Sequence, residues 1–253
     1  MTRSEDRLTL IEHLDELRRR LFICVLALIA GMIVAGVFND RVFALLLRPL
    51  PPELTEITTL SPTEPFMVSF TIWLYSGIIM ASPILIYEFW AFVGPAFTPG
   101  ERRHILPVAG ICAALFLGGV VFGYVFVLPR GLSVLLGWNS EFFNVQTRAR
   151  EYLTFVAWFL VAFGAVFEMP VILIGMVRLG IIDRQTLKKK RKFAVLIMAA
   201  VAAIATPSQD VFSMLAMFIP LLVLYEIAIV IARFFEPQRR AARHGLETSS
   251  GGP

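Results

Sequence analysis

Charged residues, cysteines and histidines are all scarce in this chain. Charged side chains make up 17% of its 253 residues and apolar ones 57%, whereas a soluble domain typically has about 25% charged and roughly 45–50% apolar residues. This composition argues against a soluble domain and indicates a membrane protein. Both cysteines, Cys24 and Cys112, lie within apolar runs, so we interpret them as small buried hydrophobic residues. The three histidines lie far apart without companion ligands at metal-binding spacing, so we predict no metal site.

Catalytic and nucleotide-binding motifs are missing as well. The chain has no Gly-x-Ser-x-Gly, no His-Glu-x-x-His and no Walker lysine loop. Its intramembrane acids do not form the paired motif of an aspartyl protease. We therefore expect no enzymatic activity and no cofactor. The net charge of +4 does not indicate nucleic-acid binding, because the basic residues lie between apolar runs and not among interleaved aromatic residues.

Six long apolar segments predict an all-α integral membrane protein with six transmembrane helices. After an amphipathic helix at residues 9–21, the segments are expected at 21–38, 66–93, 107–128, 151–177, 193–205 and 211–235. The proline-rich residues 39–65 and residues 129–150 are expected to form loops on the side opposite the termini. The fifth has about 13 residues and would cover roughly 20 Å of a hydrocarbon core about 30 Å thick. Segments five and six are therefore expected to form a short pair. We predict one domain, 1–235, and a disordered cytoplasmic tail, 236–253.

The basic residues predict the orientation of the chain in the membrane. Eighteen of the 23 Lys and Arg residues lie in the polar segments that share a side with the two termini, and five lie on the opposite side. Because Lys and Arg are enriched in cytoplasmic loops, both termini are expected in the cytoplasm. The first segment also carries Ala27, Gly31 and Ala35 at four-residue spacing, which predicts close packing against another helix.

Two acids lie on separate elements of the predicted cytoplasmic side. Glu16 precedes Arg20 by four residues, and such a pair stabilises a helix by about 0.2–0.5 kcal/mol, which is a sufficient local explanation for this acid. Glu101 lies in a proline-rich loop between the second and third apolar segments. We interpret this loop as a place where a ligand from the aqueous side is bound.

Glu168 is the acid that lies deepest in an apolar segment. It precedes Arg178 by ten residues, which places it about 15 Å from the helix end, where a charge costs about 2.5–3.5 kcal/mol even on the lower scales. This indicates a functional carboxyl or a water-filled concavity, and a protonated carboxyl bonded to a neighbouring helix is the alternative. Pro170 is expected to bend the helix beside this acid.

Three further acids have both a structural and a functional interpretation. Glu88 and Glu226 each follow a tyrosine near a predicted cytoplasmic span end, where interfacial anchoring explains such pairs. Asp210 precedes the sixth apolar segment and is suited to cap that helix. Residue types alone do not decide between these roles and a contribution to a binding site.

Considered together, these motifs resemble those of the TatC family, the receptor subunit of the twin-arginine protein translocase. Residues 13–21, HLDELRRRL, resemble its HLxELRxRL signature, and residues 61–66, SPTEPF, its SPxEPF motif. Further similarity lies at 83–102, 163–170, 191–192, 206–210 and 224–226. The similar motifs extend from residue 13 to residue 226 in the order of the family.

The resemblance implies a cup-like six-helix bundle in the bacterial plasma (inner) membrane. It implies that the chain binds twin-arginine signal peptides and recruits small single-span subunits of the TatA/TatB type. It further implies self-association in a multi-copy complex, contact with membrane lipids, and transport of folded proteins driven by the proton-motive force. Neither nucleic acid nor cofactor is expected.

The resemblance also assigns roles to individual residues. The signal-peptide site would comprise Glu16, Glu101, Arg18, Phe92 and Arg102. Intramembrane polar roles would belong to Glu168, Asp210 and Glu226, and a structural motif would comprise Pro49, Ser61, Pro62, Glu64 and Pro65. Carboxylates suit this ligand, because a guanidinium binds them bidentately and lysine does not. Met214 lies where the family often has Gln, so the side-chain amide that would contact partner helices is missing at this position.

A secondary transporter with an ion site at Glu168 and a broken helix is the alternative function. The six segments show no inverted repeat, and the strongest acids outside them lie on the predicted cytoplasmic side. The receptor function is therefore favoured.

Overall fold

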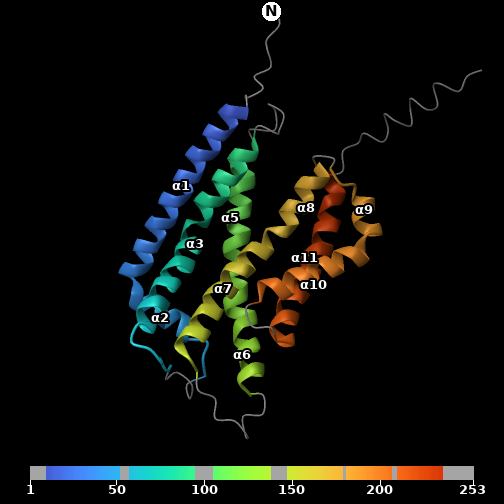
Figure 1. Ribbon diagram of the computed structural model, residues 1–253. Helices are drawn as coiled ribbons and strands as arrows, with labels where there is room; N and C mark the ends of the chain where they lie inside the picture. Colours follow the sequence, from blue (N-terminus) through green and yellow to red (C-terminus); the bar gives the residue numbers. More distant parts are fainter. Residues whose placement is uncertain are drawn as a thin grey trace, which may run out of the picture. The chain divides into compact units, whose positions relative to one another are not determined.

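The structure is a computed structural model that describes residues 10–51, 57–94, 105–137, 147–178, 181–206 and 210–235. Among these residues, the only β-type pairing is one parallel bridge between Thr58 and Arg148. Figure 1 shows the helices, which in chain order are α1 (Leu10–Val37), α2 (Asn39–Leu47), α3 (Glu64–Val93), α5 (Ile105–Phe122), the π-helical turn η3 (Gly123–Val127), α6 (Leu128–Gly137), α7 (Ala149–Phe167), α8 (Met169–Arg178), α9 (Arg184–Lys189), α10 (Arg191–Ala205) and α11 (Val211–Phe235).

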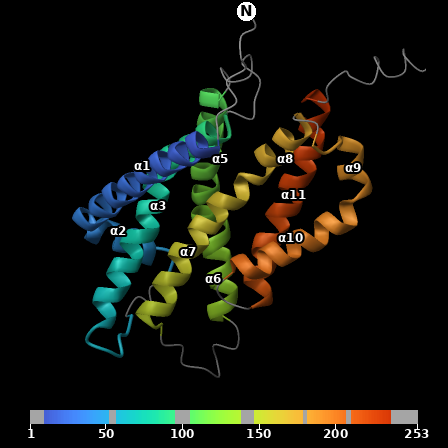
Figure 2. The ribbon, with the colours of Figure 1, turned by 45° about the horizontal axis from the view of Figure 1, so that its top comes forward.

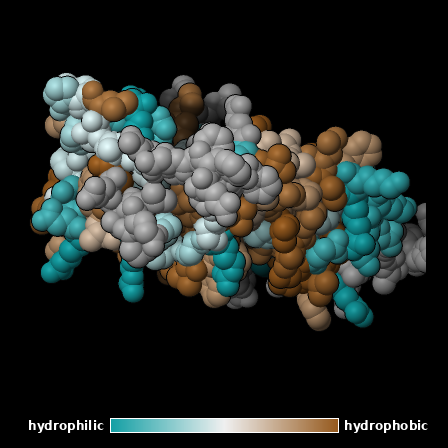
Figure 3. All heavy atoms as spheres, turned by 90° about the horizontal axis from the view of Figure 1, so that it is seen from below, coloured by the Kyte–Doolittle hydropathy of each residue, from teal (hydrophilic) through white to brown (hydrophobic). Residues whose placement is uncertain are grey.

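The apolar segments are helical, as the sequence predicts. Five helical stretches within the described residues are long and apolar enough to cross a membrane: Glu12–Val37, Glu64–Val93, Ile105–Gly137, Ala149–Arg178 and Val211–Phe234. The remaining predicted segment forms α10, which has only 15 residues. Large apolar side chains remain exposed along these helices, and the space-filling view from below shows one broad apolar area beside hydrophilic side chains (Figure 3). The predicted all-α membrane fold is confirmed.

The helices form two compact units, Met1–Ala165 and Val166–Pro253. In the first unit α1 packs on α3, and α3 packs on α5; Figures 1 and 2 show these helices side by side. In the second unit α8 and α10 both pack on α11. The single domain expected at 1–235 stays a prediction, and the tail at 236–253 lies outside the described residues.

Helices α1 and α3 approach each other closely through glycine. A Cβ atom added to Gly31 would lie 2.7 Å from the carbonyl oxygen of Gly77, so neither position has room for a side chain. Ala35, one turn further along α1, is only 1% exposed. The predicted small-residue contact is confirmed at these two positions of α1. Because Asn39 accepts a bond from Trp73 Nε1 at 3.0 Å beyond this crossing, the two helices run antiparallel.

The predicted outer loop contains a helix, α2, which the sequence analysis did not anticipate. Its last turn is stabilised from outside, because Pro49 has no N–H to donate to the carbonyl of Leu45 four residues earlier. The hydroxyl of Tyr124 donates to that carbonyl at 2.8 Å. α2 can therefore end before Pro49 without leaving the carbonyl of Leu45 unbonded.

A second tyrosine completes the end of α2. The N–H of Leu50 donates to Leu47 at 3.0 Å and so is not available to the carbonyl of Leu46. The hydroxyl of Tyr152, from α7, donates to Leu46 at 2.9 Å in a buried bond. Two helices of the first unit thus hold α2 by hydrogen bonds to consecutive carbonyls.

The third apolar helix is longer than the sequence predicts. We expected the span to end at Leu128 and a loop to begin at Pro129, but helical structure continues to Gly137. A proline inside an α-helix collides with the carbonyl four residues earlier. Here the π-helical turn η3 directly precedes Leu128 and changes the bonding pattern at this point. The proline therefore lies within a continuous helical stretch and does not end it.

In the second unit, the helix is interrupted at Glu168. We expected a bend here, and the structure shows an interruption: α7 ends at Phe167 and α8 begins at Met169, with Pro170 in its first turn. The carbonyl of Glu168 accepts bonds from the N–H groups of Val171 and Ile172, both at 3.1 Å, and so starts the new helix.

Candidate functional site

Three of the five residues expected to bind a signal peptide lie within the described residues. Glu16 and Arg18 lie in the second and third turns of α1, and Phe92 lies in the last turn of α3. Glu101 and Arg102 lie outside the described residues. The antiparallel packing brings the first turns of α1 to the end of α3, so residues far apart in the sequence meet there.

One guanidinium joins two carboxylates at this end of the helix pair. Arg20 Nε and Nη2 donate to Glu16 Oε1 at 3.0 and 2.6 Å. Arg20 Nη1 donates to Glu88 Oε2 at 2.8 Å, across 68 residues of sequence. Charge-assisted bonds of this length are among the stronger hydrogen bonds in proteins. The three residues form what we call the Arg20 cluster: Glu16, Arg20 and Glu88.

The two carboxylates of the Arg20 cluster differ in burial. The side chain of Glu88 is 9% exposed, whereas that of Glu16 is 25% exposed and that of Arg20 is 23% exposed. Removing one partner of a buried ion pair leaves an uncompensated charge, which typically costs about 3–5 kcal/mol. Loss of the guanidinium would therefore cost more free energy at Glu88 than at Glu16. Two carboxylates and one guanidinium leave the cluster with one excess negative charge.

Phe92 contributes to the same place through a ring contact. Its ring stacks on that of His13, with centroids 4.5 Å apart and planes inclined by 15°. His13 Nδ1 in turn lies 3.8 Å from Glu16 Oε2, the oxygen that Arg20 does not use. The structure thus brings Glu16 and Phe92 together through His13.

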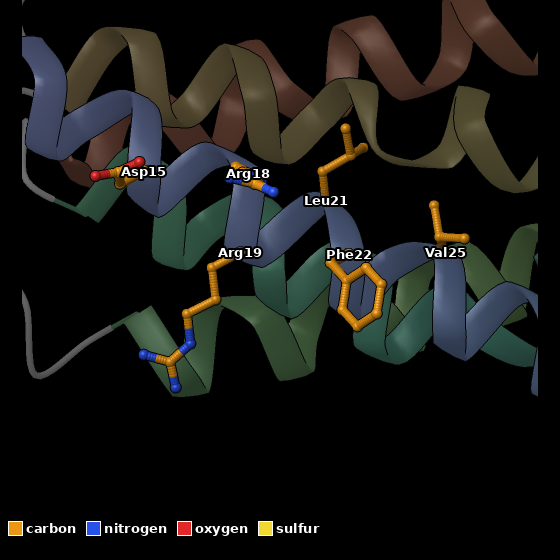
Figure 4. A pocket seen from close by; sticks show the side chains of 6 residues that line it. All are labelled: Asp15, Arg18, Arg19, Leu21, Phe22 and Val25. Carbon is orange, nitrogen blue, oxygen red and sulfur yellow. The ribbon is translucent and has the colours of Figure 1, made fainter.

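Arg18 lies on a different side of α1. The residue is exposed, and its position two residues from Glu16 places it about 200° around the helix. With Arg19 it lines an open hollow along α1, together with Asp15, Leu21, Phe22 and Val25 (Figure 4). Arg18 is therefore not brought to the Arg20 cluster.

The SPxEP motif forms the start of α3. The N–H of Glu64 donates to the carbonyl of Ser61 at 3.1 Å, so Pro62 occupies the second position of a tight turn, where proline is favoured. Pro65 then lies in the first turn of α3, where its missing N–H costs nothing. Glu64 Oε2 accepts a bond from the N–H of Leu60 at 2.8 Å and closes the turn.

Glu64 also connects two segments of the first unit. Its carboxylate is 5% exposed and its Oε1 lies 3.7 Å from Arg148 Nε. Next to this pair, Thr58 and the segment before α7 exchange backbone bonds, from Thr58 to Thr147 and from Ala149 to Thr58, both at 3.0 Å. Through Glu64, this motif connects the start of α3 to the segment before α7.

The acids of the second unit are not gathered in one place. Asp210 Oδ1 accepts a bond from the N–H of Ser213 at 2.7 Å, so this residue caps α11. Glu226 lies sixteen residues further along the same helix, about 24 Å away. Its Oε2 pairs with Arg191 Nη2 at 2.6 Å, with both side chains about half exposed. Glu168 is half-buried at the interruption between α7 and α8.

Sequence reasoning missed the partnership between Arg20 and Glu88. It paired Arg20 with Glu16 alone and explained Glu88 by its position at a membrane interface. No periodic signal connects residues on two different helices, because the pairing depends on the register between α1 and α3. In the described part of the chain, no group of three or more His, Cys, Asp or Glu residues is placed to hold a metal ion.

Comparison with known proteins gives a consistent result. The family model described as Sec-independent protein translocase protein (TatC) matches residues 12–220. A protein of Desulforapulum autotrophicum named Sec-independent protein translocase protein TatC is 41% identical over 239 residues, which is 93% of this chain and 88% of that protein. The protein of the same name from Escherichia coli K12 is 33% identical over 234 residues, 91% of this chain and 90% of that protein.

A solved structure is also similar to this chain. A crystal structure of the twin arginine translocase receptor TatC superposes with a TM-score of 0.79 at 38% identity, and the match covers 89% of this chain and 100% of that one. A second structure of that receptor, in the detergent DDM, matches with the same TM-score at 39% identity, covering 87% of this chain and 99% of that one.

Proposed function

This chain belongs to the Sec-independent protein translocase (TatC) family, and we propose that it is the subunit of a twin-arginine translocase that binds the signal peptide. In this proposal both termini lie in the cytoplasm and the six helices cross the bacterial inner membrane. The Arg20 cluster then lies at the cytoplasmic end of α1 and α3, where a signal peptide arrives. The family assignment favours this function over an ion-coupled transporter.

The contacts of Glu16 are the observation that carries the proposal. This carboxylate already accepts two bonds from a guanidinium, at 3.0 and 2.6 Å, so its position is suited to the side chain that a twin-arginine signal supplies. Phe92 at 4.5 Å from His13 adds an aromatic surface beside it. Glu101 follows α3 in the chain and would provide the second carboxylate for the second arginine.

Binding of synthetic signal peptides to the purified chain tests the proposal. We expect Glu16→Gln and Glu101→Gln each to weaken binding of an Arg-Arg peptide, and the wild type to prefer Arg-Arg over Lys-Lys. A desolvated pair would cost roughly 2–5 kcal/mol, but an exposed one less than about 1 kcal/mol. Since Glu16 is 25% exposed, we expect a loss near 2 kcal/mol, or about thirtyfold in Kd.

Asp15→Asn is the matched control, because it removes a neighbouring exposed acid that the Arg20 cluster does not include. It should change binding by less than about threefold. If the Glu16/Glu101 double variant bound the Arg-Arg peptide as well as the wild type, the assignment of the site would be wrong.

The second unit is where we propose that small single-span subunits dock. Helix α11 presents a shallow apolar groove formed by Leu222, Val223, Ile227, Val230 and Ile231, with Glu226 at its edge. Met214 replaces the glutamine frequent in the family, so docking here would depend more on apolar packing. We also propose multi-copy assembly and transport driven by the proton-motive force; copurification of the partner subunits with the chain tests the docking.

A further inference from the structure

The Arg20 cluster contains a guanidinium that belongs to the chain itself. Arg20 binds Glu16 and Glu88 with different nitrogen atoms: Nε and Nη2 contact Glu16 Oε1, and Nη1 contacts Glu88 Oε2. The bonds to the two carboxylates can therefore break independently. A movement of the guanidinium that releases Glu16 does not require the loss of Glu88.

Burial determines which of the two carboxylates Arg20 can release. Glu88 is 9% exposed and would be left as a buried lone charge without Arg20, whereas Glu16 is 25% exposed and can be reached from water. Glu16 Oε2 is not bonded to Arg20 and lies on the side of His13, 3.8 Å from Nδ1. An incoming guanidinium can thus approach Glu16 from this side while Arg20 stays on Glu88.

We propose that Arg20 competes with the signal peptide for Glu16, is held in place by Glu88, and so sets the affinity of the site. This inference rests on the proposed function of Glu16. In the free chain Arg20 occupies Glu16; when a twin-arginine peptide binds, one of its arginines takes Glu16 and Arg20 remains on Glu88. Binding is an exchange of one guanidinium for another at the same carboxylate.

The exchange limits the affinity of Glu16 for any basic ligand. Because the peptide must replace bonds that Arg20 already makes, its affinity is a difference between two similar interactions and stays modest. A lysine presents a single ammonium without the planar fork of arginine, so it replaces those bonds less well. Competition by Arg20 thus lowers the affinity of the site for both peptides by the same factor, while the preference for arginine comes from the fit of its planar fork to the carboxylate.

Two single variants of the Arg20 cluster should change affinity in opposite directions. Arg20→Gln releases Glu16, so we expect the Arg-Arg peptide to bind about tenfold more tightly, with the preference over Lys-Lys unchanged. Glu88→Gln leaves Arg20 with Glu16 as its remaining carboxylate, so we expect weaker binding of the same peptide. A merely structural ion pair predicts weaker binding in both variants. Binding is measured with a labelled synthetic peptide and the full-length chain in lipid nanodiscs.

The double variant Arg20→Gln/Glu88→Gln controls for unfolding caused by an unpaired Glu88. It leaves no buried lone charge and keeps the net charge of the chain. It should also bind the Arg-Arg peptide more tightly than the wild type. Arg19→Gln is the control for general electrostatics, since Arg19 is exposed outside the Arg20 cluster, and it should change binding by less than about threefold. If the double variant bound no more tightly than the wild type, the exchange would be refuted.

The outcomes separate this inference from the proposed function. A wild type that does not distinguish Arg-Arg from Lys-Lys, with no effect of Glu16→Gln, would refute the receptor function and the exchange together. A wild type that does distinguish them, with Arg20→Gln indistinguishable from Arg19→Gln, would refute the exchange alone.

Discussion

The close approach of α1 and α3 can be tested by adding one methyl group. In Gly31→Ala the new Cβ would lie 2.7 Å from the carbonyl oxygen of Gly77, well inside ordinary contact distance. The obstacle is backbone, so the helices must move apart by several tenths of an ångström. Gly118 provides a matched control, because it lies in α5 with open space around its added Cβ.

Two opposing effects determine the size of the change. Replacing glycine by alanine inside a helix stabilises it by about 0.8–1.0 kcal/mol, whereas overpacking a tight contact costs about 1–3 kcal/mol. Gly118→Ala has only the first effect and should be stabilised by up to about 1 kcal/mol. Gly31→Ala has both, so it should be less stable than Gly118→Ala by about 1–3 kcal/mol.

Thermal unfolding of the purified variants in the same detergent measures this difference. Signal-peptide binding provides a second measurement, because the Arg20 cluster depends on the register between α1 and α3. We expect Gly31→Ala to weaken binding and Gly118→Ala to leave it unchanged. A Gly31→Ala variant as stable as Gly118→Ala would show that α1 and α3 are not in close contact at Gly31 and Gly77.

Two further predictions concern other parts of the chain. Tyr152→Phe leaves the buried carbonyl of Leu46 without its donor and should lower the free energy of unfolding by about 1–3 kcal/mol; Tyr124→Phe, whose bond to Leu45 is exposed, should cost less, and equal thermal shifts in the two variants would contradict this account. For Glu168, we propose that the carboxyl faces a wet concavity that assists transport. Glu168→Gln should then keep transport of a folded substrate, whereas Glu168→Leu should lose it; a fully active Leu variant would mean that the carboxyl is only tolerated.

Local features of the fold could be predicted because they depend on local physics. A membrane-spanning segment must satisfy its backbone internally, so length and apolar composition are enough to predict a helix. The interruption at Glu168 follows from Pro170 for the same reason, since a proline affects the bonds of its own helix. The short α10 was likewise predicted from the length of its apolar run.

Two predictions were wrong because another feature of the folded chain offsets the effect of a proline. The proline-rich outer segment was predicted as a loop, but α2 forms there because Tyr124 and Tyr152 supply the donors that its last carbonyls lack. Pro129 was predicted to end a helix, but the π-helical turn η3 precedes it and the helix continues. The tyrosine donors come from distant parts of the chain, and apolar periodicity does not distinguish a π-helical turn from an α-helical one.

The sequence by itself determined the apolar segments, the family and the acids expected to meet a basic ligand. Only the tertiary structure decided how those acids are used. Arg20 and Glu88 are 68 residues apart, and their bond exists because Gly31 and Gly77 allow α1 and α3 to pack in one antiparallel register. Periodicity shows which face of a helix is apolar, but the register between two helices depends on how their side chains fit together. For this reason the internal guanidinium at Glu16 became visible only in the folded chain.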